Sequence, residues 1–129
     1  MKNKINIIKF TLIVIFFLYP KAFSNDQFNF NVTELEITND GNLVKGIKRG
    51  TILTDDGIQF DADEFVYNKI TNIFNASGNI NVVDKVQNIL ISSDEATYDK
   101  NNQKILTEGN SKVIDVNKNI TIDAERFDY

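Results

Sequence analysis

Apolar and polar residues alternate along most of the chain beyond residue 27, and a period of two predicts β-strands with one buried face. In the clearest stretch, Phe60 and Ala62 share one face. The phase then shifts by one residue, so that Phe65 and Tyr67 take the inward positions. Such a shift turns the apolar side chains outward unless the backbone bends or bulges. We therefore expect a bend at the intervening pair Asp63-Glu64.

The bent stretch recurs at a nearly constant interval. Its copies span residues 30–37, 60–67, 91–98 and 122–129, and a second stretch spans 76–84 and 107–115. The stronger copies are 31 residues apart. A fixed period of this length is typical of stacked repeats that bury their apolar faces against their neighbours.

Polar turn signals separate the strands. Runs of Asn, Asp and Gly, which favour tight turns, predict hairpins at 39–42, 55–57, 68–72 and 99–103. Beyond residue 24 apolar residues do not recur at helical spacing. The sequence thus predicts an all-β fold, a V-shaped β-roll built from repeats of about 31 residues.

Stacking the copies aligns their inward apolar residues into one trough. Its predicted lining comprises Phe30, Ile52, Phe60, Phe74, Ile80, Val82, Ile91, Ile105 and Ile122. This trough is either the closed core of a small β-roll or an open groove that holds long acyl chains. Periodicity alone is compatible with both.

The first 24 residues have the features of a secretory signal peptide. Lys2 and Lys4 precede an apolar run to Tyr19, and Ala22-Phe23-Ser24 suits signal peptidase. We expect a signal-peptide helix in residues 1–24 and a mature domain in residues 25–129. An uncleaved membrane anchor is the alternative, although the run is short for a membrane span.

Composition argues against an enzyme and against nucleic-acid binding. The 129 residues contain no cysteine or histidine, which removes the thiolate nucleophile and the commonest general base. Four of the 14 basic residues precede residue 25, so the mature part keeps 10 basic and 18 acidic residues, a net charge of −8. Binding to nucleic acid needs the opposite charge.

Two groups of charged residues are candidates for chemistry. Asp63-Glu64 and Asp94-Glu95 resemble acid–base pairs or calcium ligands, but their recurrence at every bend favours a structural role. We predict no metal site and no cofactor. Lys45, Lys48 and Arg49 form the one basic cluster, which either keeps the surface soluble or meets an anionic headgroup at the mouth of the trough.

The repeat also carries a recognisable motif. One copy contains Phe60-Asp61-Ala62-Asp63, Tyr67-Asn68-Lys69 and the run Ala76-Ser77-Gly78-Asn79-Ile80-Asn81-Val82-Val83-Asp84. The next contains Ser93-Asp94, Tyr98-Asp99-Lys100 and Glu108-Gly109-Asn110. This order resembles the OstA-like repeat of the lipopolysaccharide transport proteins LptA and LptD. The resemblance covers residues 28–129, although Ser93 and Glu108 depart from the motif.

The resemblance implies a non-enzymatic β-jellyroll in the periplasm of a Gram-negative bacterium. In this family the V-shaped sheet joins other jellyrolls head to tail by strand addition. The resulting bridge shields the acyl chains of lipid A on their way to the outer membrane. An inner-membrane ATPase supplies the energy, so no catalytic residue is implied here.

Within the family, residues 30–37 and 48–57 are most similar to the N-terminal domain of LptD. Because the last copy lacks its return strand after Tyr129, we expect the domain to be truncated at its C-terminal side. A stand-alone bridge similar to LptA is the close alternative. A secreted β-solenoid with a filled interior and a structural role is a more distant one.

Overall fold

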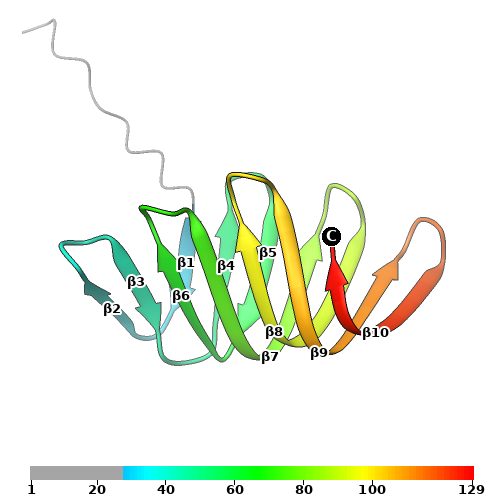
Figure 1. Ribbon diagram of the computed structural model, residues 1–129, viewed down its shortest axis with the longest axis horizontal. Helices are drawn as coiled ribbons and strands as arrows, with labels where there is room; N and C mark the ends of the chain where they lie inside the picture. The colour runs from blue at the N-terminus through cyan, green and yellow to red at the C-terminus, as the bar shows by residue number, and fades with distance from the viewer. Residues whose placement is uncertain (1–27) are drawn as a thin grey trace, which may run out of the picture.

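The computed structural model describes residues 28–129, which form a single antiparallel sheet (Figure 1). The prediction of an all-β fold is confirmed. The strands are β1 (Phe28–Val32), β2 (Leu35–Thr38), β3 (Leu43–Gly46), β4 (Gly50–Thr54), β5 (Ile58–Ala62), β6 (Glu64–Asn68), β7 (Ile73–Asp84), β8 (Ile89–Asp99), β9 (Lys104–Asp115) and β10 (Ile120–Asp128). The predicted signal-peptide helix lies outside the described residues.

The sheet is a meander of bent strands. Each of the first three bent strands consists of two short strands that follow one another in the chain, namely β1 and β2, β3 and β4, and β5 and β6. The longer β7 follows the same bent path in one piece, because its first half pairs with β6 and its second half with β5. Strands β8, β9 and β10 then add in sequence order.

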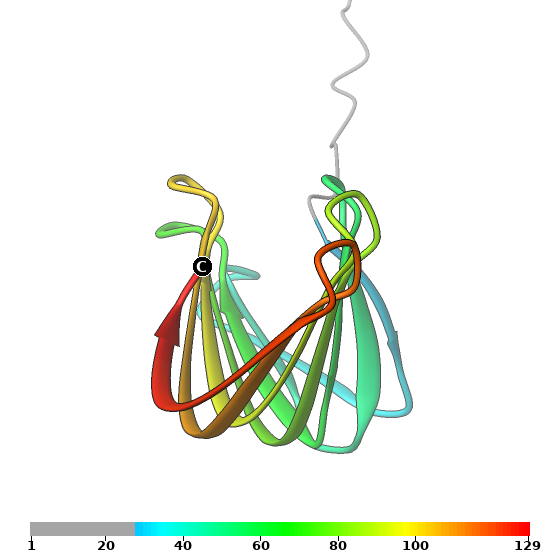
Figure 2. The same ribbon diagram turned by 90° about the vertical axis from the view of Figure 1, so that its right-hand side faces the viewer.

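Seen along the stack, the sheet forms a V with two walls (Figure 2). The first wall contains β1, β4, β5 and residues 80–84, 89–93, 111–115 and 120–124. The second wall contains β2, β3, β6 and residues 73–77, 95–99, 104–108 and 126–128. We call the line where the walls meet the vertex, and the turns at their free edges the first and second rims.

The bend lies where the apolar phase shifts in the sequence. Asp63 separates β5 from β6, and the register between β8 and β9 shifts between Ser92 and Glu95. The predicted bend at the acidic pairs is therefore confirmed. Gly78 lies inside β7, where its positive φ of 78° turns the strand at the vertex.

The four predicted hairpins are present, and the full set of turns alternates between the rims along the chain. Turns at 39–42, 69–72 and 100–103 lie on the second rim. The first rim carries turns at 55–57, 85–88 and 116–119, of which only the first was predicted. Asn72 and Asn88 adopt the left-handed conformation that closes such turns (φ 57° and 58°).

Candidate functional site

An apolar ladder runs across the inner face of the first wall. Strand pairing places Phe30 opposite Ile52, which in turn lies opposite Phe60. The ladder continues from Phe60 through Val82, Ile91 and Val113 to Ile122 on the last strand. The predicted trough residues of this wall thus follow one another across the whole sheet.

Most of the trough is filled by its own side chains. Seven of the nine predicted lining residues are at most 3% exposed: Ile52, Phe60, Phe74, Ile80, Val82, Ile91 and Ile105. Aromatic rings meet between the walls, with Phe60 packed against Phe74 at 5.0 Å and against Tyr98 at 5.6 Å between ring centroids. In this conformation the middle of the trough is a packed core.

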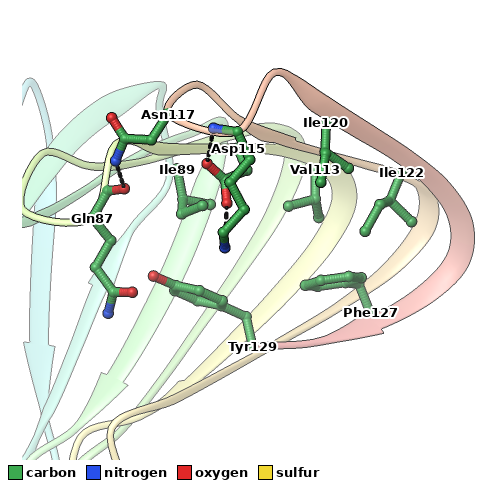
Figure 3. Close-up of a pocket in the computed structure, with 10 residues that line it drawn as sticks. Gln87, Ile89, Val113, Asp115, Asn117, Ile120, Ile122, Phe127 and Tyr129 are labelled. Atoms are coloured by element: carbon green, nitrogen blue, oxygen red, sulfur yellow. Dashed lines mark hydrogen bonds and ion pairs between the residues drawn. The ribbon is translucent and has the colours of Figure 1, made fainter.

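The trough opens at its C-terminal end, where a cleft of about 520 Å³ lies between the walls. Figure 3 shows Phe127 and Tyr129 on one side and Ile120, Ile122 and Val113 on the other. Ile120 and Ile122 are 47% and 44% exposed although they belong to the inward-facing series. Gln87, Asn117 and the ion pair between Lys118 and Asp115 give the cleft a polar border. The size suits a small amphipathic ligand.

The basic cluster lies elsewhere. Lys48 and Arg49 belong to the bend between β3 and β4, so they lie at the vertex and not at the mouth of the V. Their charges are paired, Lys48 with Glu34 and Arg49 with Asp63, each at 2.8 Å. Lys45 faces outward on β3, next to the buried Val44. The structure therefore places Lys48 and Arg49 away from the mouth, where the headgroup alternative required them, and the solvated surface is the alternative that fits their position.

The acidic pairs have structural contacts. Asp63 accepts a hydrogen bond from Asn79 Nδ2 at 2.6 Å, and Asp94 accepts the equivalent bond from Asn110 at 2.7 Å. Hydrogen bonds from Arg49 and Asn79 lower the pKa of Asp63 below its usual value. An ionised, hydrogen-bonded carboxylate of this kind fixes the bend and is not arranged as a general acid.

A group of polar side chains missed in the sequence joins the two rims. Asp56 on the first rim accepts hydrogen bonds from Tyr98 OH at 2.5 Å and from Lys100 Nζ at 2.9 Å, both on the second wall. Lys100 also forms an ion pair with Asp55, and Thr54 donates a hydrogen bond to Asp56. The Lys100 side chain is only 12% exposed.

These contacts shift the pKa values of the groups that make them. Burial raises the pKa of Asp56, but the hydrogen bonds from Thr54, Tyr98 and Lys100 outweigh it, so the pKa lies below the usual value. Burial and the neighbouring Asp56 raise the pKa of Tyr98. Although burial lowers the pKa of Lys100, its bonds to Asp55 and Asp56 raise it overall. Ionised Asp56 and Lys100 thus hold a neutral Tyr98.

A second bridge of the same kind lies nearer the open end. Tyr129 OH, on the second wall, donates a hydrogen bond to Asp84 Oδ2 on the first wall at 2.9 Å. The other oxygen of Asp84 accepts from the backbone amides of Val86 and Gln87. Burial, followed by this hydrogen bond, raises the pKa of Tyr129 to about 12.

Tyrosine ionisation should therefore report on closure of the V. Tyr67, Tyr98 and Tyr129 all have raised pKa values, so their neutral forms stabilise the fold below pH 10 and this stabilisation is lost as pH rises through the folded-state pKa values. Replacing Tyr19, the fourth tyrosine of the chain, with phenylalanine leaves only these three to titrate. In this variant, phenolate absorbance should develop well above the midpoint near pH 10 that holds for unfolded chains. The same variant in urea is the control, and equal midpoints would contradict the prediction.

The fold and this site define the class of the protein, which is all-β with an apolar interior between two walls. No known family model matches the chain, and no curated protein matches it. Within residues 28–129, no helix is long and apolar enough to cross a membrane. In the same part of the chain, no three acidic or other ligating side chains are placed to hold a metal ion.

Proposed function

We propose that this protein is a non-enzymatic carrier whose apolar groove shields the acyl chains of lipopolysaccharide during transit across the periplasm to the outer membrane. One observation above all supports the proposal. The apolar ladder of the first wall ends at Ile122, which, like the nearby Ile120, faces inward but is exposed, in a cleft with a polar border. An amphipathic lipid offers the matching chemistry, an apolar chain with a polar head.

The repeat motif supports the same proposal. The bent strands are consistent with a β-jellyroll, the sequence pattern recurs every 31 residues, and the sequence of residues 1–24 resembles a signal peptide for export. On this basis the chain corresponds to a domain similar to the N-terminal domain of LptD. A stand-alone bridge similar to LptA is the alternative within the same class.

Partners would attach through the edges of the sheet. Within residues 28–129, the outer edge of β10 has no strand partner, and neither do those of β1 and β2 at the other end. An unpaired edge is a template for strand addition. Any segment or jellyroll that pairs with β10 would extend the apolar ladder beyond Ile122, which is what head-to-tail assembly requires.

Photo-crosslinking from the groove tests the proposal. We expect benzoylphenylalanine at Ile122 to label lipopolysaccharide, because this side chain faces the cleft. Leu90 is the matched control, since it is 39% exposed and apolar but alternates with the buried Ile89 and Ile91 and so faces outward. Equal labelling from both positions, or none from Ile122, would contradict the carrier and favour the structural β-solenoid.

A further inference from the structure

The rims of the V are joined by polar bonds in a place where the trough beneath has no space for a ligand. The side chains in the middle of the trough are packed against one another, and those from the two walls interleave. A protein interior of this kind is close-packed, so an acyl chain can enter it only if the walls move apart. At the vertex the walls are held by continuous strands, so the rims must separate.

Separation of the rims would break identifiable bonds. Asp56 belongs to the turn between β4 and β5 on the first rim, while Tyr98 and Lys100 lie at the end of β8 on the second. Their contacts link residues 42 and 44 positions apart in the chain. The bond from Tyr129 to Asp84 makes the same kind of crossing closer to the open end.

We infer that the contacts of Tyr98 and Lys100 with Asp55 and Asp56 form a releasable clasp, which holds the two walls together when the groove is empty and opens when a lipid chain occupies its middle. This inference builds on the proposed function by adding how the groove is loaded. The clasp and the lipid chain compete, because the clasp forms only when the walls are close together and the chain fits only when they are apart. Weakening the clasp should therefore favour the ligand.

The partly buried, charged character of the clasp suits a switch. Lys100 and Asp56 are shielded enough for their bonds to hold the rims, but they lie at the water-exposed edge of the core, so each group is rehydrated when the rims part. A bond deep in the core would leave buried charges unpaired on opening. The position at the rim avoids that penalty.

The distance between the rims tests the clasp without any lipid. The chain has no cysteine, so spin labels can be placed at Ile70→Cys on the second rim and Val86→Cys on the first, which are 68% and 76% exposed. We expect one narrow distance distribution in the labelled parent. Adding Tyr98→Phe and Lys100→Met should broaden it or shift it to longer distances. An unchanged distribution would overturn the inference.

A matched variant controls for loss of a lysine charge. Lys118→Met removes an ion pair to Asp115 within a single turn of the first rim, so the rim distance should not change. Should the double variant fail to fold, Lys100→Met alone serves in its place, because it retains the Tyr98 hydroxyl and its hydrogen bond to Asp56. An equal change in the Lys118 variant would contradict the assignment to Lys100.

Binding of a fluorescent long-chain fatty acid tests the competition. The dissociation constant of this probe should be at least about fivefold lower in the clasp variants, because one hydrogen bond typically changes an equilibrium constant by that factor. Joining Asp55→Cys to Lys100→Cys with a short bismaleimide should instead weaken binding. Unchanged or reversed effects would overturn the competition. Absence of probe binding in every form would count against the proposed function, and the rim distances would then decide on the clasp alone.

Discussion

Replacing Phe74 with alanine should lower the free energy of unfolding by about 3–5 kcal/mol, the range for large aromatic truncations in a packed core. The Phe74 side chain is fully buried and extends from the second wall into the space between the two walls. Its ring packs against those of Phe60, Phe28 and Phe65 at centroid distances of 5.0, 5.7 and 5.8 Å. The cavity left behind would remove packing contacts from rings of both walls at once. Urea unfolding followed by circular dichroism measures the loss.

Val86→Ala provides the control for this measurement. Val86 is apolar but lies in the turn 85–88 and is largely exposed, so its truncation should change stability by no more than about 0.5 kcal/mol. If Phe74→Ala cost less than about 1 kcal/mol, the middle of the trough would not be the close-packed core described above. That result would favour a groove that stands open without ligand.

The apolar pattern predicted the path of the strands because it records which face of the chain is inward. The phase shift around Asp63 required a bend, and the structure has one there. The turns at 85–88 and 116–119 were not predicted, although, like the predicted turns at 68–72 and 99–103, they are rich in polar residues and lack glycine. The left-handed residues that close them, Asn88 and Asn119, are the signal that could have revealed these turns.

Trough residues could be predicted, but their exposure could not. Whether an inward side chain is buried depends on how far the stack continues beyond it, so Ile91 and Ile122 occupy equivalent positions and differ in exposure. Nearness in sequence grouped Lys48 and Arg49 as a cluster but could not show that they lie at the vertex. Both residues occupy a bend, where the acidic residues of neighbouring bends pair with them.

The bridges between the rims could not be predicted from periodicity. The repeat shows which residues stack within one wall, whereas the bond from Tyr98 to Asp56 depends on how one wall is displaced relative to the other. Asp55 and Asp56 were already explained as residues that favour a tight turn, so the sequence offered no reason to assign them a contact with the other wall. The even spacing of Tyr67, Tyr98 and Tyr129 at the inner side of the second rim was the available hint.

Replacing Gly78 with alanine should destabilise the fold by about 2–3 kcal/mol, because strain in the left-handed region and overpacking act together. Gly78 has φ of 78°, and a Cβ there would lie 2.7 Å from Asp63 Oδ2 and 3.0 Å from Asp63 Cβ. Asp63 cannot move aside easily, because Arg49 and Asn79 hold its carboxylate. Gly109 repeats this geometry against Asp94, so Gly109→Ala should behave alike.

Gly41→Ala separates the two causes. Gly41 has φ of 86° but nothing within 4 Å of its Cβ position, so its substitution should show the cost of backbone strain alone, about 1 kcal/mol. The remaining cost at Gly78 should come from Asp63. In a double-mutant cycle with Asp63→Ala, the two changes should therefore cost less together than the sum of their separate costs. Strict additivity would show that the contact between Asp63 and Gly78 does not fix the bend, and that the phase shift of the strands has another origin.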